Sequence, residues 1–142
     1  MKVYISGKIG EEVISEATRQ KFAKAEAMLL AKGYEVVNVT SFEQQASLMG
    51  YLRMMRGFMP EQKFDRYTET LLWCLFKLRR CDAVFFLYDW IDSPGAIAEH
   101  KFAKATQKKM LWESWGDAQL FNADNERPED VWLPIAGKEG GV

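Results

Sequence analysis

Apolar residues recur along the first forty positions with two different spacings, which predict alternating strands and helices. Strand-forming residues cover 2–5, and apolar positions three and four apart follow over about 15–32. Ser15 can cap this helix, Gly33 can end it, and an apolar run at 34–39 predicts a second strand. The order strand, helix, strand is that of a parallel crossover unit, which we expect to be right-handed.

The pattern weakens between residues 40 and 60 and then becomes regular again. This stretch is rich in methionine and lacks strand alternation, which predicts a short helix and a loop over the mouth of a cleft. Its methionines indicate either an adaptable lid or an irregular filler of the core. A long helix is predicted next, starting at Glu61 or Tyr67 and ending at Arg80. Its residues expected to face the sheet are Leu71, Leu72, Leu75, Phe76 and Leu78.

The segment 83–88 is almost continuously apolar and aromatic, which predicts a strand covered on both faces. Polarity begins at Asp89, and the breakers Pro94 and Gly95 then mark a loop. An alanine-rich helix is predicted over 93–107. Ligands of open parallel sheets bind beyond the carboxyl ends of the strands, so we expect a functional site near this loop.

A fourth strand is predicted near 109–112, after which the chain becomes polar and rich in turns. One further apolar run, 131–135, is a possible short fifth strand, and the glycine-rich end is expected to fray. Together the elements predict one α/β domain over residues 1–142. We expect a flavodoxin-like, doubly wound parallel sheet in the order 2-1-3-4 with helices on both faces.

Composition narrows the class of partners. The 142 residues carry a formal net charge of −1, which provides no positive field for a nucleic acid polymer. No apolar run approaches the ~20 residues of a membrane-spanning helix, and MKVYISG turns polar too early for a signal peptide. We therefore expect a cytoplasmic protein that binds neither a nucleic acid polymer nor a membrane.

Cysteine and histidine are too few for a metal centre. Cys74 and Cys81 lie seven apart on or beside one predicted helix, too far for a disulfide and too few for structural zinc. They are interpreted as small buried hydrophobic residues in a reducing compartment. His100 is the one histidine. We expect neither a metal ion nor a cofactor.

Two loops that contain glycine are predicted to meet where the strand order reverses. Residues 6–10 can expose backbone N–H groups and supply a lysine, but they match no known phosphate-binding or dinucleotide-binding motif. In the second loop, Ser93 is a natural N-cap and Pro94 a natural first helical residue. This loop either only starts a helix or holds an anion through Gly95, Ala96 and the serine hydroxyl. Two such turns across a cleft would fit one phosphate.

Glu99 lies about one turn into the helix that follows the second loop. A glutamate there often only complements the helix dipole. The small residues Ala96, Ala98 and Ala103 indicate a helix packed close to the sheet, so that Glu99 would point into a crevice. A carboxylate in that place could act as a nucleophile on a sugar carbon.

Several segments combine into one pattern, made of Val3–Gly7, Gly33–Asn38, Cys81–Val84, Trp90, Ser93, Gly95–Ala96 and Glu99. This pattern resembles the nucleoside 2-deoxyribosyltransferase-like superfamily, in particular its small bacterial and phage members. The spacing of Ser93, Gly95 and Glu99 is also similar to that of 2′-deoxynucleoside 5′-phosphate N-hydrolases. The resemblance covers residues 1–112 and leaves 113–142 as an unassigned tail.

The resemblance implies a homodimer or larger homo-oligomer that cleaves or exchanges the N-glycosidic bond of a nucleoside or nucleotide. Glu99 would be the nucleophile that forms a deoxyribosyl-enzyme intermediate. Tyr4 would line the sugar pocket, and Trp90 would either stack on the base or only bury a strand end. The 5′-phosphate or 5′-hydroxyl would be held by the two loops. The candidate substrate-binding residues are Tyr4, Ser6, Gly7, Lys8, Trp90, Ser93, Gly95 and Ala96.

The sequence departs from this family at one position. The family usually has an aspartate eight residues before the position of Asp82, where this chain has Cys74. That aspartate is expected to work with the glutamate around the leaving base, which a neutral thiol does poorly. The carboxylates that could substitute for it are Asp65, Glu69, Asp89 and Asp92.

Three functions remain open from the sequence. The first is the glycosidic enzyme, and the second is a nucleotide-binding module that has lost its chemistry with the aspartate. The third is a protein-interaction domain that uses residues 48–59 with Trp112 and Trp115, although these residues could equally form a homo-oligomer interface.

Overall fold

The computed structural model describes residues 1–10 and 12–135, and the predicted fraying of the chain end lies outside these residues. It contains one four-stranded, fully parallel sheet in the order β2-β1-β3-β4, which confirms the predicted topology. The strands are β1 (Lys2–Ser6), β2 (Glu35–Val37), β3 (Ala83–Phe86) and β4 (Lys109–Trp112). Every residue of β3 is buried, as expected for a strand covered on both faces.

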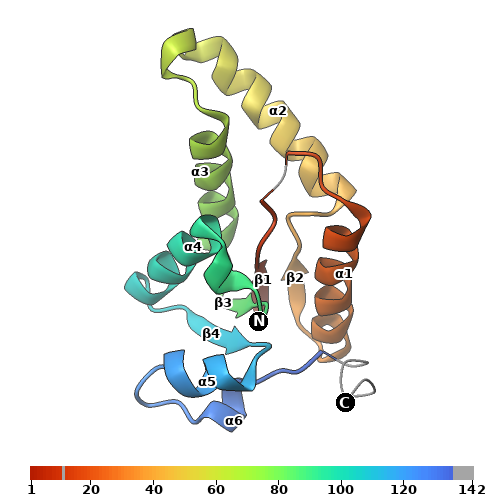
Figure 1. The fold of residues 1–142 in the computed structure, drawn as a ribbon, viewed down its shortest axis with the longest axis vertical. Coiled ribbons are helices and arrows are strands. Elements are labelled where there is room, and N and C mark those ends of the chain that lie inside the picture. The colour runs from red at the N-terminus through yellow and green to blue at the C-terminus, as the bar shows by residue number, and fades with distance from the viewer. Residues whose placement is uncertain (11, 136–142) are drawn as a thin grey trace.

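Helices cover both faces of the sheet, with α1 on one side and α3 and α4 on the other (Figure 1). The helices are α1 (Glu16–Ala31), α2 (Phe42–Phe58), α3 (Arg66–Arg79), α4 (Pro94–Ala105), α5 (Trp115–Phe121) and α6 (Pro128–Val131). Two single 3₁₀ turns, η1 (Glu61–Lys63) and η2 (Trp90–Asp92), precede α3 and α4. Ser15 caps α1 through its side chain, and Gly33 takes a φ of 90° after it, so both predicted ends of that helix are confirmed.

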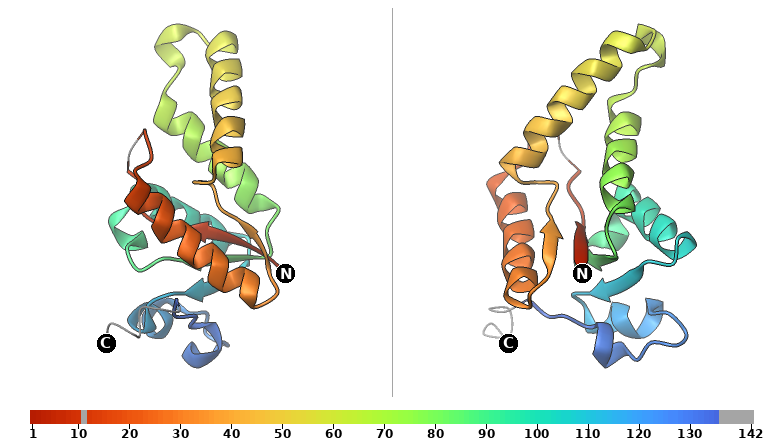
Figure 2. Two further views of the ribbon diagram at one scale, coloured as in Figure 1. Left: turned by 90° about the vertical axis from the view of Figure 1, so that its right-hand side faces the viewer. Right: turned by 180° about the vertical axis from the view of Figure 1, so that it is seen from behind.

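The stretch 40–60 differs from its prediction of a short helix and a loop, because α2 is one continuous helix of 17 residues. The Ser41 side chain caps it, and Leu48 and Leu52, one turn apart, are its buried residues. The methionines do not fill the core, since Met54 is half exposed. Helices α2 and α3 form an arm that extends beyond the carboxyl ends of the strands (Figures 1 and 2).

The inner face of helix α3 matches its prediction only in part, since Leu78 is buried as predicted but Leu72 and Phe76 are not. It starts at Arg66 after the cap Asp65, and its buried residues are Glu69, Trp73 and Leu78. Leu72 and Phe76 are 43% and 55% exposed, so they do not face the sheet. The reason is that α3 packs against α2 as well as α4, which selects the row of Glu69 and Trp73 as a buried face.

The possible fifth strand at 131–135 does not form. Val131 ends α6, and Trp132 makes one isolated parallel bridge with Trp112 in β4. The Leu133 N–H donates to the Trp112 carbonyl at 2.8 Å, but Pro134 has no N–H to continue a ladder. Within the described part of the chain, no helix is both long and apolar enough to cross a bilayer.

Candidate active site

Glu99 is a buried carboxylate on α4 whose two oxygens are each held by a hydroxyl group of β1. The Tyr4 hydroxyl donates to Oε2, and the Ser6 hydroxyl donates to Oε1 at 2.7 Å. Tyr4 and Ser6 are two residues apart in one strand, so their side chains project from the same face of the sheet. Glu99 itself is only 6% exposed. The carboxylate is therefore fixed in orientation and points toward the sheet.

Burial changes the protonation of this carboxylate. Loss of solvation raises the pKa of Glu99 from 4.5 to about 7, although the hydrogen bonds from Tyr4 and Ser6 favour the ionised form and oppose the shift. Burial likewise raises the pKa of the Tyr4 hydroxyl, so this group stays protonated and remains a donor. Near neutral pH, Glu99 thus exchanges readily between its acid and carboxylate forms, a property common among catalytic carboxyls.

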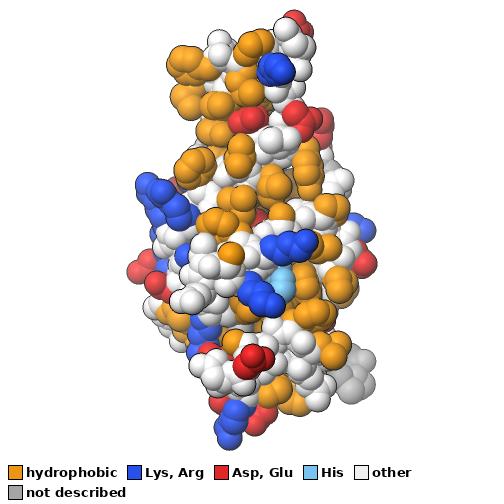
Figure 3. Space-filling view, turned by 90° about the vertical axis from the view of Figure 1, so that its left-hand side faces the viewer, with side chains coloured by type: hydrophobic (Ala, Val, Ile, Leu, Met, Phe, Trp, Pro, Cys, Tyr) orange, Lys and Arg blue, Asp and Glu red, His pale blue; other side chains and the backbone are white. Residues whose placement is uncertain are grey.

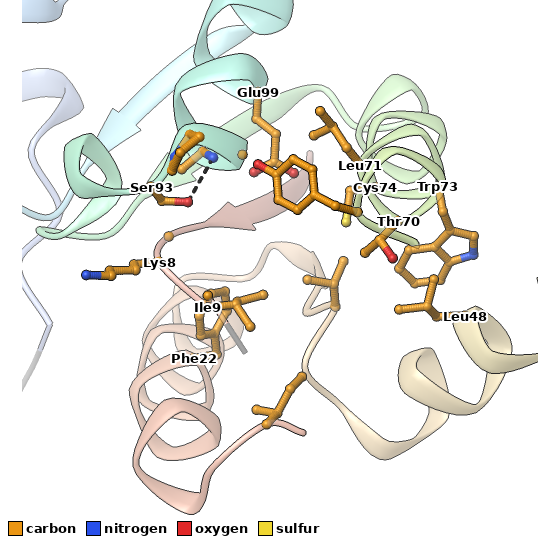
Figure 4. A pocket seen from close by; sticks show the side chains of 18 of the residues that line it. Lys8, Ile9, Phe22, Leu48, Thr70, Leu71, Trp73, Cys74, Ser93 and Glu99 are labelled. Atoms are coloured by element: carbon orange, nitrogen blue, oxygen red, sulfur yellow. Dashed lines mark hydrogen bonds between the residues drawn. The ribbon is translucent and has the colours of Figure 1, made fainter. Parts of the chain in front are cut away.

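Glu99 opens onto a cavity of about 550 Å³, which is within the ~300–1,000 Å³ typical of small-molecule sites. The cavity lies beyond the end of β1 and is enclosed by residues from α1, α2, α3 and the start of α4 (Figure 4). Much of its wall is apolar, with Phe22, Leu48, Leu71 and Trp73 among the lining residues. A mostly apolar hollow with a few largely buried ionisable groups, here Tyr4, Cys74 and Glu99, is the usual form of an enzyme pocket.

The two glycine-containing loops meet at this cavity, as predicted. Residues Gly7 and Lys8 of the first loop line it, as do Ser93, Gly95 and Ala96 of the second. Gly7 is required by close packing, because a Cβ there would lie 2.6 Å from Leu87 Cδ1. Its lack of a side chain therefore brings the first loop against the chain that leaves β3.

The predicted anion cradle is largely occupied by the protein itself. The Lys8 N–H donates to Asp89 Oδ1 at 3.0 Å, and Asp89 also pairs with Lys21 at 2.5 Å. The Ala96 N–H donates to Ser93 Oγ at 3.2 Å, which is the capping bond that starts α4. Gly95 provides the remaining N–H of the predicted pair. The two loops thus offer fewer free donors to a phosphate than the sequence indicated.

Ser6 and Trp90 take places other than those expected for substrate-binding residues. Ser6 is buried and serves Glu99 rather than lining the cavity. Trp90 is 3% exposed, packs against Phe86 and Phe121, and donates its Nε1–H to Asp117. It also lies outside the cavity wall, so the alternative interpretation, burial of a strand end, is the one that fits.

Cys74, the position at which the sequence departs from the pattern it resembles, lines the cavity close to Tyr4 and Glu99. Burial and the neighbouring Glu99 raise the pKa of the Cys74 thiol to about 12. The thiol is therefore neutral and a poor acid.

The four carboxylates considered as substitutes lie elsewhere. Asp65 caps α3, and Glu69 accepts a hydrogen bond from the Tyr51 hydroxyl without lining the cavity. Asp89 is bound to the first loop, as described above. Asp92 does line the cavity, but it is exposed. None of the four therefore occupies the buried position beside Glu99.

The sequence analysis missed the contribution of α3 to the site. Arg66, Tyr67, Thr70 and Trp73 all line the cavity, and a Cβ at Gly95 would lie 3.5 Å from the Tyr67 hydroxyl. The spacing of these residues places them on one side of a helix, but the sequence interpretation considered only the leucine and phenylalanine positions of this helix as its inner face. Helix α3 thus forms a wall of the cavity and reaches the start of α4.

The proposed protein-interaction surface is divided by the structure. Trp112 is fully buried, so it cannot contact a partner. Trp115 is 40% exposed and packs edge-on against Trp132 at 5.0 Å. Of the stretch 48–59, the side chains of Met54 and Phe58 are exposed. Of the residues that the interaction hypothesis names, those on the arm and Trp115 are therefore exposed, whereas Trp112 is not.

Comparisons with known proteins give one match. A family model described as a domain of unknown function, DUF4406, matches residues 1–112. No curated protein and no solved structure matches the chain. The matched range contains Glu99, its hydroxyl partners and the described cavity wall, and it ends with the last residue of β4. Among residues 1–10 and 12–135, no group of three histidine, cysteine, aspartate or glutamate side chains is arranged to hold a metal ion.

Proposed function

This chain belongs to the DUF4406 family, a domain of unknown function, and from that premise we propose that it is an N-glycosidase or glycosyl transferase of the nucleoside 2-deoxyribosyltransferase type. Its substrate would be a nucleoside or deoxynucleoside, free or as its 5′-monophosphate. One observation supports this most strongly: Glu99 is buried, oriented by two hydroxyls and aimed at a cavity of suitable size.

In the proposed reaction a Glu99 oxygen attacks the anomeric carbon C1′ while the bond from C1′ to the base breaks. The sugar passes through an oxocarbenium-like state, which the carboxylate stabilises because the cavity excludes much of the solvent. Tyr4 and Ser6 keep the carboxylate in a single orientation throughout. Water, or a second base, then displaces the glutamate from C1′ and restores the enzyme.

The other end of the substrate would lie at the cavity mouth. Ser93 and Gly95 offer a hydroxyl and an N–H there, and Lys8 and Arg66 are the cationic residues of the described lining. A 5′-hydroxyl or 5′-phosphate at this end would place the pentose between the two loops and Glu99. The aromatic and aliphatic wall from α2 and α3 would then receive the base.

The test is incubation with a panel of nucleosides, deoxynucleosides and 5′-monophosphates, followed by chromatography for free base. Wild type is compared with Glu99→Gln and with Glu69→Gln, a buried glutamate that does not line the cavity. The proposal predicts base release by wild type and by Glu69→Gln, and none by Glu99→Gln. Unchanged turnover in Glu99→Gln would remove the mechanism.

A binding module without chemistry is the second candidate, and Cys74 favours it. The thiol replaces the acid that related enzymes use, and the pKa of this thiol is raised to about 12. In that case a nucleotide would raise the thermal stability of the protein by mass action and would be recovered intact. The same chromatography separates the two candidates.

We also propose a homo-oligomer, as the resemblance implies, and a cytoplasmic location, as the composition indicates. Exposed apolar side chains of the arm support self-association, and Figure 3 shows apolar atoms spread over this end of the molecule. The exposed large apolar residues described on the two helices are Phe42, Met49, Met54, Phe58, Tyr67, Leu72 and Phe76. Sedimentation of the full chain tests this, and a monomer at micromolar concentration would contradict it.

A further inference from the structure

Among the residues that the structure describes, no positively charged side chain is hydrogen-bonded to the Glu99 carboxylate. Its hydrogen-bond partners are two neutral hydroxyls, those of Tyr4 and Ser6. Among the described residues of the cavity wall, the cations are Lys8 and Arg66. Lys8 is exposed and its side chain extends away from Glu99 (Figure 4), and Arg66 lies 3.7 Å from Glu12. A buried carboxylate usually has a cationic partner, so this site has room for a ligand that supplies one.

The cavity also lacks an acid next to Glu99. Besides Glu99, the described lining contains the carboxylates Glu12 and Asp92, both exposed. The nearest ionisable group from α3 is the neutral thiol of Cys74. A neutral base that leaves C1′ takes the bonding electron pair and becomes an anion unless an acid protonates it. General acids commonly accelerate such steps by about 10²–10⁴-fold. The described lining places no second carboxyl beside Glu99 to act as one, and the Tyr4 hydroxyl already donates its proton to Glu99.

We propose, resting on the proposed glycosidase function, that the substrates of this site are N-glycosides whose base is already a cation, such as N-ribosylpyridinium compounds. A cationic base leaves as a neutral molecule, because the electron pair of the broken C1′–N bond cancels its charge. No proton donor is then needed. The same positive charge is the missing partner of the Glu99 carboxylate.

The wall of the cavity suits such a base. Tyr4, Phe22 and Trp73 line it, and the faces of aromatic rings attract cations. A cation near Glu99 also favours the ionised carboxylate, and hence the nucleophile, through its charge. By linkage, ionisation of Glu99 strengthens binding of the cation to the same extent. Substrate charge and nucleophile activation are therefore coupled.

The chemical steps balance without a further reactant. An oxygen of Glu99 forms a bond to C1′ while the C1′–N bond breaks, and its electron pair moves to the ring nitrogen, which becomes neutral. A water molecule then attacks C1′, the bond from C1′ to the carboxylate breaks, and Glu99 regains its negative charge. The proton of the attacking water passes to solvent. The products are the neutral base and the free pentose or pentose phosphate.

The experiment compares substrates matched in shape but different in charge, with wild-type enzyme and with the uncatalysed rate subtracted. The pairs are 7-methylguanosine with guanosine, and nicotinamide mononucleotide with its dihydro form. We expect kcat/KM to be larger for the cationic member by about 10²–10⁴-fold, the range that a general acid would otherwise supply. Equal or faster release from the neutral members would overturn the inference while leaving the proposed function intact.

Two variants of Cys74 test whether the lack of a second carboxyl beside Glu99 limits the cleavage of neutral substrates. Cys74→Asp places a second carboxyl beside Glu99, and two such carboxyls retain a proton near neutral pH. We expect this variant to gain cleavage of guanosine, whereas Cys74→Ser does not gain it. Guanosine cleavage by Cys74→Ser at the rate of Cys74→Asp would contradict the inference. The proposed glycosidase function itself would be contradicted if no substrate released its base. It would also be contradicted if Glu99→Gln cleaved the substrates as fast as wild type. If Cys74→Asp does not fold, the comparison of wild-type substrates still decides.

Discussion

Helix α4 separates two buried regions, and the neighbouring residues Glu99 and His100 belong to different ones. Glu99 faces the cavity and two hydroxyls. His100 faces a filled cluster of rings, with its centroid 4.8 Å from that of Trp90 and 5.8 Å from that of Trp112. Burial raises the pKa of Glu99 and lowers the pKa of His100, so it favours the neutral form of both.

The two side chains differ in their hydrogen-bond partners and in their access to the cavity. Glu99 has donors that stabilise its charged form and a cavity that admits a ligand. His100 has Nε2 buried without a hydrogen-bond partner among the described residues, and Lys104 lowers its pKa further. Ionisation is therefore attainable on one side of α4 and disfavoured on the other. Glu99, which is buried, is thus a candidate nucleophile, and the partly buried His100 is a structural residue.

The largest expected effect is on turnover. Glu99→Gln should lower kcat by roughly 10³-fold or more, because no carboxylate remains to attack C1′. His100→Gln should leave kcat within a few-fold, since its ring lies on the opposite side of α4 from the cavity. Steady-state kinetics on the best substrate of the panel measure both. An equal loss of kcat in the two variants would contradict the proposal that Glu99 is catalytic and His100 structural.

The next effect is on stability in the aromatic region. Trp90→Ala should lower the free energy of unfolding by roughly 3–5 kcal/mol, because it removes a large buried side chain from a filled cluster. Trp115→Ala, at a half-exposed position, is the matched control and should cost clearly less. Urea denaturation provides both values. A raised KM with unchanged stability in Trp90→Ala would show instead that Trp90 contacts the base.

A pH effect on stability should come from Glu99. Because its folded-state pKa is about 7 rather than 4.5, it contributes stability that is complete below pH 4.5 and lost as the pH rises to 7. The loss should approach about 3 kcal/mol, since one pKa unit corresponds to roughly 1.4 kcal/mol. Urea denaturation from pH 4 to 8 should therefore show Glu99→Gln gaining on wild type as the pH rises. A constant difference would mean that the buried carboxyl is not perturbed.

The lowered pKa of His100 acts in the opposite direction. It contributes stability above its unfolded pKa of about 6.5 that is lost as the pH falls through its folded value. This contribution is present in both wild type and Glu99→Gln, so it cancels in their difference. The His100→Gln variant should lack it, which identifies the two contributions separately.

The smallest effect concerns the positioning residue Ser6. The nucleophile must be ionised, so kcat/KM of wild type should rise with pH around 7. Ser6→Ala removes a hydrogen bond that lowers the pKa of Glu99, which should move this rise to higher pH and reduce kcat/KM a few-fold at pH 7. The loss should be largely recovered at pH 9. A loss of the same size at every pH would point to a merely structural role.

The sheet and the inward direction of Glu99 could be predicted because local sequence determines them. Ser15 and Gly33 mark the ends of α1 by capping chemistry, and the crossover rule then places β2 beside β1. Ser93 starts α4 in the same way. Glu99 lies on α4 at a fixed spacing from Ser93, so the sequence predicts that its side chain points inward.

The errors lie where long-range packing decides. Helix α2 buries mainly Leu48 and Leu52, too few residues to give a clear periodic pattern over 40–60. Trp90 is covered by α5, and its Nε1–H donates a hydrogen bond to Asp117 of that helix. The two residues are 27 positions apart, so the sequence around Trp90 does not predict this contact. The anion cradle was overestimated for the same reason, since Asp89 fills one turn only after folding.

The most direct test of the central claim is mass spectrometry of the peptide that contains Glu99, after acid quenching during turnover of nicotinamide mononucleotide. The account predicts an added phosphoribosyl group on the Glu99 carboxyl, absent in Glu99→Gln. An added group on any other residue would contradict it. So would an unmodified Glu99 peptide during a burst of nicotinamide equal to the enzyme concentration.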